Sequence, residues 1–256
     1  MARSSLSTGN AVVKIFGHFA TVLFGDPAVY DRYRWLRRNL APGPLCTLDA
    51  GCGSGSFTMY AAKRGNDALG VSFEERNNAA ASERARVLGL GNVKFMTADL
   101  KKLDGLLPQI GAFDQIICCE TIEHIMDDAK LVRDFALLLL PGGRVLITTP
   151  YKHGRFWRNA TYSEVENGDH VRIGYDEGDF VRLFSDAGLA LVRVDYVSGF
   201  FTQKLLVVGQ ALSRRMNPKL VWAMTFPFRA LQLLDPLFAR FGCTALSIAV
   251  VGQKNN

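Results

Sequence analysis

The chain has 256 residues, 48% of them hydrophobic and 21% charged, and a formal net charge of +6. It is long enough to bury a full core, and five cysteines without a Cys-x-x-Cys pair argue against a disulfide framework or a zinc site. We therefore expect a reduced, cytoplasmic compartment. Residues 1–40 hold six Lys and Arg against two Asp, and residues 200–256 hold seven against one. Both flanks are therefore basic, which favours an anionic surface as partner.

The first forty residues precede the first predicted strand. Their apolar run, residues 12–24, is interrupted by Lys14 and His18, and no small-x-small cleavage site follows it. The run is therefore not typical of a signal peptide. Tyr30, Tyr33 and Trp35 come next, followed by two arginines. These residues are compatible with an amphipathic helix that packs on the core.

A glycine-rich segment follows the short apolar run at residues 45–48. Residues 48–55 read Leu-Asp-Ala-Gly-Cys-Gly-Ser-Gly, and residues 57–64 have a helix-like pattern. Gly51, Gly53 and Gly55 carry no Cβ, so their backbone N–H groups can approach a ligand closely. Asp49, at the end of the predicted strand, is expected to face the same crevice with its carboxylate.

The remaining apolar runs alternate with helical patterns. They predict strands at residues 68–72, 93–96, 113–119, 144–149, 189–197 and 245–251. Pro141-Gly142-Gly143 predicts a turn before one of these strands, and residues 176–187 are predicted to form a helix. This alternation predicts an α/β fold with a doubly wound, mostly parallel, seven-stranded sheet and a ligand at the carboxyl ends of the strands.

The glycine-rich segment and the strand spacing, over about residues 45–253, resemble the class I S-adenosylmethionine-dependent methyltransferases. The pattern is most similar to that of the ubiquinone-pathway O-methyltransferases and related small-molecule and lipid methyltransferases. The resemblance implies a Rossmann-like core at residues 41–199, S-adenosylmethionine as cofactor, and a helical lid at residues 1–40. It assigns cofactor binding to Asp49, Gly51, Cys52, Gly53, Gly55, Ser72, Asn77, Asp99, Leu100, Cys119 and Glu120.

Ser72 departs from the usual pattern, because many nucleotide-binding folds place an Asp or Glu at the end of this strand. The resemblance to cyclopropane fatty acid synthases and sterol methyltransferases implies that Ser72 and Asn77 contact the ribose. The alternative is that Asn77 lies in a solvated helical turn and Glu74 makes the contact. Asp99 matches the carboxylate that accepts a hydrogen bond from the adenine amino group in this family.

Residues 120–124 read Glu-x-x-Glu-His, and we expect them at the start of a helix. Glu120, Glu123 and His124 would then share one face. Two carboxylates beside an imidazole can hold a divalent cation. By resemblance to the small-RNA 2′-O-methyltransferases this would be Mg²⁺, with His170 as the later ligand. The alternatives are a catalytic or cofactor contact without metal, and a structural role. Catalysis is assigned to Glu123, His124 and His153.

An insertion is predicted between the last two strands, at residues 200–242, before the last strand in residues 243–256. Phe201, Leu205, Val208 and Leu212 recur at helical spacing, and a second such series runs from Pro227 to Phe238. Basic residues that include Arg229 are expected on the remaining faces. No uncharged apolar run reaches the roughly 18 residues of a membrane span. The insertion could therefore cap an apolar pocket, lie on a membrane surface, pack on the sheet edge or form a dimer contact.

These features predict methyl transfer from S-adenosylmethionine to oxygen on a hydrophobic small-molecule or lipid-like acceptor. The alternatives are a metal-dependent RNA 2′-O-methyltransferase, a C-methyltransferase of an isoprenoid or aromatic acceptor, and a binding module without transferase activity. Nucleic acid is disfavoured as partner, because the basic residues are interleaved with Leu and Phe. We expect a monomer or homodimer in the cytoplasm that contacts the inner membrane face peripherally.

Overall fold

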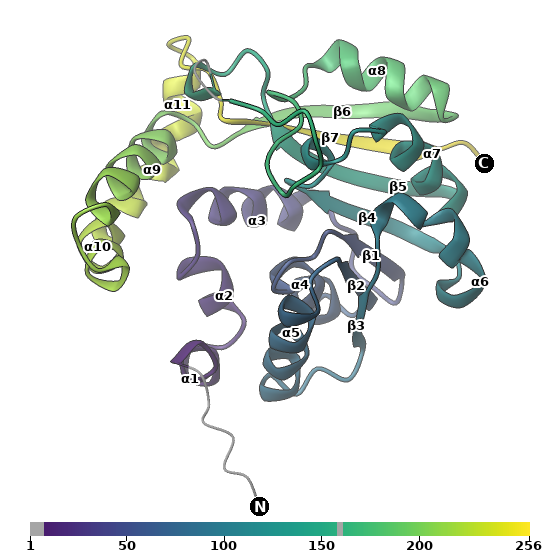
Figure 1. The fold of residues 1–256 in the computed structure, drawn as a ribbon, viewed down its shortest axis with the longest axis horizontal. Helices are drawn as coiled ribbons and strands as arrows, with labels where there is room; N and C mark the ends of the chain where they lie inside the picture. Colours follow the sequence, from purple (N-terminus) through teal and green to yellow (C-terminus); the bar gives the residue numbers. More distant parts are fainter. Residues whose placement is uncertain (1–7, 158–160) are drawn as a thin grey trace, which may run out of the picture.

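The computed structural model describes residues 8–157 and 161–256, which build one seven-stranded sheet of order β3-β2-β1-β4-β5-β7-β6 (Figure 1). Strands β1 to β5 pair in parallel, and β7 is antiparallel to both of its neighbours. The predicted fold class is therefore confirmed. The strands are β1 (Cys46–Ala50), β2 (Asp67–Ser72), β3 (Val93–Thr97), β4 (Phe113–Cys119), β5 (Leu139–Pro150), β6 (Leu189–Val197) and β7 (Ser247–Lys254).

Strand β5 differs from its prediction, because it begins at Leu139 and includes the Pro-Gly-Gly sequence that was predicted as a turn. Gly142 has a φ of +73° there. The β4–β5 pairing also shifts register between Phe113 and Gln115. The turn residues therefore produce an irregularity within the strand and do not end it.

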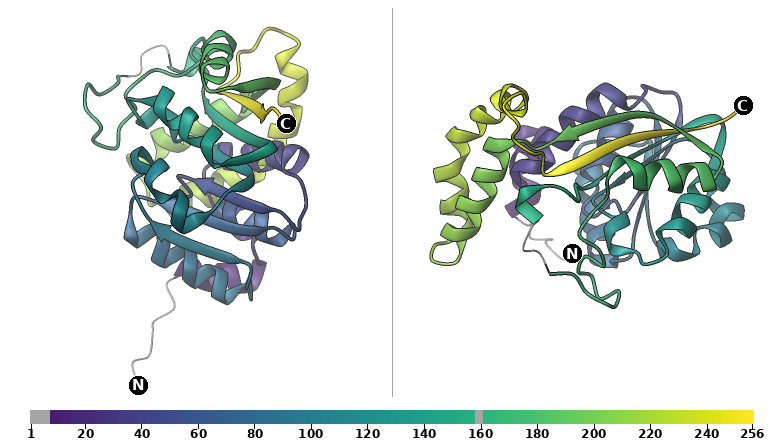
Figure 2. Two further views of the ribbon diagram at one scale, coloured as in Figure 1. Left: turned by 90° about the vertical axis from the view of Figure 1, so that its right-hand side faces the viewer. Right: turned by 90° about the horizontal axis from the view of Figure 1, so that it is seen from above.

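Helices cover both faces of the sheet (Figure 2). One face packs in a core that includes Trp35, Leu36 and Tyr60, and the other in a core that includes Phe135 and Phe180. Alternate residues of the strands supply the two cores, as the period of two requires. The helices of the core are α3 (Pro27–Asn39), α4 (Ser56–Lys63), α5 (Glu75–Val87), α6 (Leu107–Ile110), α7 (Asp128–Leu138) and α8 (Glu177–Asp186), with short 3-10 turns η1 (Leu100–Lys102), η2 (Asp104–Leu106), η3 (Ile122–His124) and η4 (Arg155–Trp157).

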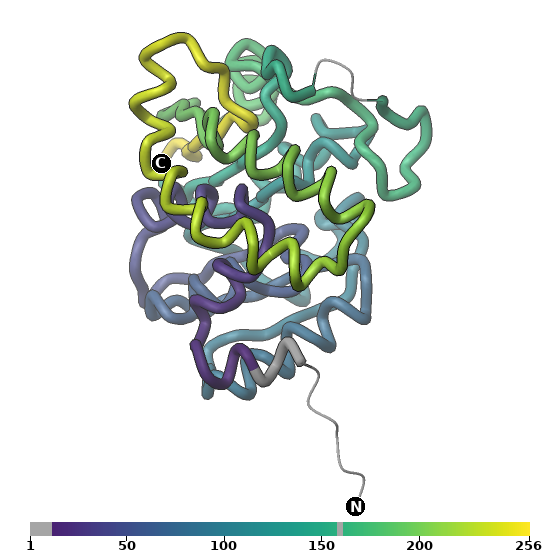
Figure 3. Tube along the Cα trace, turned by 90° about the vertical axis from the view of Figure 1, so that its left-hand side faces the viewer, coloured from purple at the N-terminus to yellow at the C-terminus, as the bar shows by residue number. Residues whose placement is uncertain are grey.

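The two flanks of the chain lie side by side at one end of the sheet (Figure 3). The N-terminal flank forms α1 (Thr8–Phe16) and α2 (Phe19–Leu23) before α3. The insertion forms α9 (Phe200–Ser213), α10 (Pro218–Thr225), the 3-10 helix η5 (Phe226–Leu234) and α11 (Asp235–Ala239). The predicted continuous helical series from Pro227 to Phe238 is thus a 3-10 helix followed by a short α-helix. Within the described residues, no helix is both long and apolar enough to cross a bilayer.

Buried polar contacts join the insertion to the N-terminal flank. The rings of Phe24 and Trp222 stack with centroids 4.5 Å apart. Arg229, expected on an exposed face, is buried and donates hydrogen bonds to the carbonyl oxygens of Leu23 and Gly25, at 2.6 and 2.7 Å. These carbonyls follow the last turn of α2, where an arginine can satisfy acceptors that the helix leaves unpaired. Arg229 therefore links the two flanks.

A carboxyl pair on α3 and α11 adds a second junction. The Thr202 hydroxyl lies 2.6 Å from Asp31 Oδ2 and 2.9 Å from Asp235 Oδ2, and it accepts from Gln232 Nε2. One hydroxyl hydrogen cannot be donated to two carboxylates, so the geometry favours a proton on one acid. Burial raises the pKa of Asp31 to about 6, and the charge of Asp235 also raises it. Below about pH 6, Asp31 is therefore the acid that holds the proton.

The Asp31 junction predicts a pH-dependent stability. Because the folded-state pKa of Asp31 exceeds its ordinary value of 3.8, its contribution to stability is full below about pH 4 and is lost as pH rises through about 6. The shift corresponds to about 3 kcal/mol. Urea unfolding between pH 4 and 8 should show a smaller decline for Asp31→Asn than for the wild-type chain. If the free energy of unfolding declines equally with pH in the two proteins, protonation of Asp31 does not stabilise the fold.

Candidate functional site

The glycine-rich loop joins β1 to α4 at the carboxyl edge of the sheet. The N–H groups of Gly51 and Cys52 donate to the carbonyl oxygen of Val71 at 2.9 and 3.0 Å, which ties the loop to β2. Gly51 has a φ of +82°, and a Cβ there would lie 2.2 Å from Thr121 Oγ1. Among the described residues, the N–H groups of Gly53 and Ser54 have no acceptor. The loop thus presents free donors just before the N-terminus of α4.

Asp49 lies behind this loop and is almost fully buried. Its Oδ2 accepts a hydrogen bond from the Thr58 hydroxyl of α4 at 2.6 Å. Burial raises the pKa of Asp49 to about 6. In this arrangement Asp49 fixes α4 against β1. Cys52, also buried, places its sulfur 3.7 Å from Asn78 Oδ1.

The ends of β2 and β3 are joined by Asn78, which the sequence analysis missed. Asn78 is buried and donates to the Ser72 carbonyl oxygen at 3.2 Å and to Thr97 Oγ1 at 2.9 Å. Ser72 is also buried, and its hydroxyl accepts from the Glu74 N–H. Asn77 donates to Glu74 Oε2 at 3.0 Å in an exposed position. The predicted ribose contacts Ser72 and Asn77, and their alternative Glu74, therefore lie at one strand end.

At the end of β3, the Asp99 side chain accepts from the Lys101 N–H at 3.0 Å and thereby caps η1. Leu100, the next residue, is buried. Asp99 is half-buried and its second carboxylate oxygen lies 3.9 Å from Lys101 Nζ. If Asp99 contacts adenine as predicted, its carboxylate must accept a hydrogen bond from the ligand while it also caps η1.

The segment after β4 is not the predicted start of a helix. Cys119 ends β4, and Glu120 has a φ of +49°, a left-handed conformation that a helix cannot include. Residues 122–124 form only the 3-10 turn η3, and α7 begins at Asp128, capped by Asp127. Glu120 donates its N–H to the Thr148 carbonyl oxygen and lies with its carboxylate 3.4 Å from Arg32 Nε of α3.

Glu123, His124 and His170 form a cluster whose potential ligand atoms lie within 4.8 Å of one another. Glu123 is fully buried; its Oε2 accepts from Thr149 Oγ1 at 3.0 Å, while its Oε1 and His124 Nδ1 are buried without partners among the described residues. The rings of His124 and His170 are perpendicular, with centroids 4.7 Å apart. Glu120, predicted as a fourth ligand, is not part of this cluster.

The environment sets the charge of two members of the cluster. Burial raises the pKa of Glu123 well above its usual range, and the charge of Glu120 raises it further. Burial lowers the pKa of His170 below 6.5, and the neighbouring His124 lowers it further. The cluster therefore holds an acid that keeps its proton to a higher pH than usual and, in His170, an imidazole that is neutral at pH 7 and can accept a proton.

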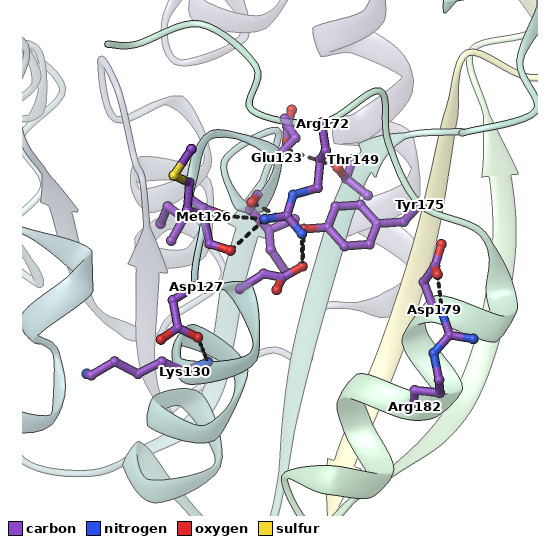
Figure 4. A network of polar contacts seen from close by, with 12 residues as sticks. Glu123, Met126, Asp127, Lys130, Thr149, Arg172, Tyr175, Asp179 and Arg182 are labelled. Atoms are coloured by element: carbon purple, nitrogen blue, oxygen red, sulfur yellow. Dashed lines mark hydrogen bonds and ion pairs between the residues drawn. The ribbon is translucent and has the colours of Figure 1, made fainter. Parts of the chain in front are cut away.

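The loop that carries His170 is fastened to the Glu123 segment (Figure 4). Arg172 donates to the carbonyl oxygens of Ile125 and Met126, at 2.7 and 2.8 Å, and pairs with Asp128. The Tyr175 hydroxyl donates to Asp128 Oδ2 at 2.8 Å. The Val171 N–H donates to the Glu123 carbonyl oxygen. The sequence signal for this role is weak, because the partners of Arg172 lie 44 to 47 residues earlier in the chain.

His124 and His170 line a cavity of about 630 Å³, whose other walls include Trp157 and Tyr162. The Trp157 ring lies 5.4 Å from that of His170, and its Nε1 donates to the Leu246 carbonyl oxygen at 2.8 Å. Predicted catalytic residue His153 is not brought into this cavity. It is exposed and lies 3.2 Å from Asp176 Oδ2, the N-cap residue of α8.

The two predicted ligands fit the site unequally. Free N–H groups before a helix N-terminus fit the carboxylate of S-adenosylmethionine. Thr148 Oγ1, near Glu120, is buried without a partner in the part of the chain that the structure describes and offers a further polar atom. The donor set of the cluster does not fit Mg²⁺, because two of its three ligands are imidazoles and Mg²⁺ is bound through oxygen. One carboxylate and two imidazoles suit zinc, iron or another transition metal.

Comparisons with known proteins agree with this geometry. Residues 28–194 match the sequence family described as "Methyltransferase domain". The chain is 37% identical over 102 residues to the ubiquinone biosynthesis O-methyltransferase of Methylococcus capsulatus and 32% identical over 102 residues to that of Acinetobacter baumannii strain AYE. Each match covers 40% of this chain and 42% of the relative, so the chain matches less than half of each relative's length.

A solved structure of an S-adenosylmethionine-dependent methyltransferase from Aquifex aeolicus is similar to this chain with a TM-score of 0.54. It is 15% identical, and the similarity covers 95% of this chain and 97% of that one. At this identity the likeness concerns the fold alone.

Proposed function

The chain belongs to the methyltransferase domain family, and we propose that it transfers a methyl group from S-adenosylmethionine to an oxygen of a hydrophobic small-molecule or lipid-like acceptor. One observation carries the proposal. A neutral imidazole and a buried acid lie beside a cavity that Trp157 and Tyr162 line together with polar residues, at the sheet edge that also holds the glycine-rich loop. Proton removal and apolar binding are the two requirements of such an acceptor.

The chain's own residues provide the cofactor cradle. The N–H groups of Gly53 and Ser54 would hold the carboxylate, while Ser72, Asn77 and Asp99 at the ends of β2 and β3 would hold the nucleoside. When bound, S-adenosylmethionine supplies an electrophilic methyl carbon on a sulfonium. These residues would fix the direction in which the acceptor approaches the methyl carbon. Positioning of this kind can lower the barrier to methyl transfer by several kcal/mol.

A base is needed because a hydroxyl is a weak nucleophile until it loses its proton. His170 suits this role, since its lowered pKa keeps the imidazole neutral at pH 7 and the ring faces the cavity. His124 lies against it in a perpendicular arrangement. Glu123, whose pKa burial raises, adds a buried acid within 4.8 Å of both imidazoles.

The Trp157 side of the cavity favours an apolar group on the acceptor. Trp157 and Phe156 pack on a cluster of Ala28, Leu206 and Leu246, which come from α3, α9 and the segment before β7. The insertion therefore supports the cavity from behind. A flat ring with an apolar tail would bury its ring against Trp157, whereas a nucleic acid would leave this apolar support unused.

The cluster also supports a second candidate, a metal-dependent O-methyltransferase. A transition metal held by Glu123, His124 and His170 would lower the pKa of the acceptor hydroxyl directly. An RNA acceptor under this mechanism would require binding that weakens steeply with salt. Activity in the presence and absence of a chelator separates the metal-dependent mechanism from the metal-free one.

Transfer of a labelled methyl group to a panel of acceptors tests the proposal. We expect a phenol with a prenyl tail to have a kcat/KM at least about 10-fold above that of the same phenol without the tail, because burial stabilises by about 0.8 kcal/mol per methylene. The panel also contains RNA with a free 3′-terminal 2′-hydroxyl. Transfer to RNA alone would contradict the proposal, as would transfer that is indifferent to the tail.

A further inference from the structure

The 3-10 helix η5 of the insertion buries polar side chains and exposes apolar ones. In a 3-10 helix, residues three apart lie on one row. The row of Arg229, Gln232 and Asp235 is buried, although all three are polar. The row of Phe228, Leu231 and Leu234 is exposed, by 57%, 38% and 44%. An element that buries its polar row and exposes its apolar row to water requires a partner for the apolar row.

The buried polar row has a structural explanation in the contacts described above. Arg229 and Gln232 donate to carbonyl oxygens of the N-terminal flank, at Leu23, Gly25 and Pro27. Asp235 accepts from the N–H groups at the start of α9. These contacts fix the rotation of η5, so the apolar row is held outward by the fold.

The exposed apolar surface continues beyond η5. Phe16, Phe24, Trp222 and Phe226 follow one another with ring centroids 5.8, 4.5 and 4.6 Å apart, which joins α1 and the end of α2 to α10 and η5. Phe16 is 59% exposed. Large exposed apolar patches of this kind mark sites of interaction with proteins or membranes.

The charges around this exposed apolar surface distinguish a membrane from a protein as its partner. Within residues 200–246 the only acidic residue is Asp235, which is buried. Lys204, Arg214, Arg215, Lys219 and Arg240 are all exposed. Apolar rows bordered by five cations, with one exposed acid, Asp26, at their edge, match a surface that is apolar inside and anionic outside. We propose that the exposed apolar side of residues 15–24 and 220–241, the docking face, binds an anionic lipid bilayer.

The position of the docking face fits the delivery of a lipid-like acceptor, and in this respect the inference rests on the proposed function. Strand β6 runs parallel to β5, because both are antiparallel to β7. The insertion therefore emerges from the carboxyl edge of the sheet, where the site residues lie. Helix α3 connects the two regions, since Arg32 contacts Glu120 and Asp31 contacts Thr202.

Co-sedimentation of the whole chain with vesicles, without cofactor or acceptor, tests the docking face independently of activity. We expect binding to vesicles of phosphatidylcholine with phosphatidylglycerol, weaker binding at high salt, and little binding to phosphatidylcholine alone. Phe228→Ser/Leu233→Ser should weaken binding by about 10-fold or more. The matched control is Leu137→Ser/Val181→Ser on α7 and α8, which changes two equally exposed apolar residues away from the docking face.

Thermal unfolding of both variants accompanies the binding measurement and shows that each is folded. The proposal is supported if only the Phe228/Leu233 variant loses binding. It is overturned if the wild-type chain does not bind anionic vesicles, or if both variants bind equally. Light scattering at increasing protein concentration tests whether a second copy of the chain binds the docking face instead. If the wild-type chain forms a dimer that the Phe228/Leu233 variant abolishes, and does not bind vesicles, the docking face is a dimer interface.

Discussion

Replacement of Gly53 by alanine is expected to weaken S-adenosylmethionine binding by about 10-fold or more, with a loss of only about 1–2 kcal/mol in the free energy of unfolding. Gly53 has a φ of +50°, and an added Cβ would meet no atom of the described residues within 4 Å. The fold therefore bears only the backbone strain. A ligand that uses the N–H groups of Gly53 and Ser54 would meet the new methyl group, and loss of one charge-assisted hydrogen bond is worth about this much affinity.

Two other glycines make this experiment specific. Gly89→Ala is the matched control, because Gly89 has a φ of +66° and equally open surroundings at the far end of α5. It should show the same backbone cost and unchanged affinity. Gly51→Ala should lose more stability, because its Cβ would lie 2.2 Å from Thr121 Oγ1. Calorimetric titration and urea unfolding measure the two quantities. If Gly53→Ala binds S-adenosylmethionine with wild-type affinity, the assignment of the cofactor carboxylate to the N–H groups of Gly53 and Ser54 is wrong.

The order of strands and helices could be predicted because local patterns encode it. Each strand is a short apolar run, and the capping box of α8 places Asp176 and Asp179 three residues apart. The Pro-Gly-Gly sequence was a weaker guide. It predicts a turn locally, and residues 140–143 pair with neither neighbour; β5 pairs with both β4 and β7 from Arg144 onward.

The site was harder to predict, because contacts distant in sequence decide its local geometry. Nothing in residues 120–124 indicates that Glu120 has a positive φ; its neighbours there are Thr148 of β5 and Arg32 of α3. The same holds for Asn78 and Arg172, whose roles depend on partners 19 and 44 or more residues away. Residue type predicted the imidazole and carboxylate chemistry, whereas the assembly of Glu123 with His170 needed the fold.

His170→Gln is expected to lower kcat by about 100-fold or more, the usual contribution of a positioned general base. The pH dependence carries the diagnostic information. A base accepts a proton only while it is unprotonated, so the wild-type rate should be lost on acidification and recovered above the pKa of His170. Burial and His124 place that pKa below 6.5. The residual rate of His170→Gln should lack this step.

Two comparisons decide what the loss in His170→Gln means. If a chelator abolishes wild-type activity and zinc or manganese restores it, His170 acts as a metal ligand and the metal-free base is wrong. If the chelator has no effect and the acid step disappears with His170, the base assignment stands. His153→Gln distinguishes the predicted alternative site, since His153 lies with Asp176 outside the cavity. If kcat falls more in His153→Gln than in His170→Gln, the acceptor binds beside His153 and not in the cavity, because only a group in contact with the acceptor can take its proton.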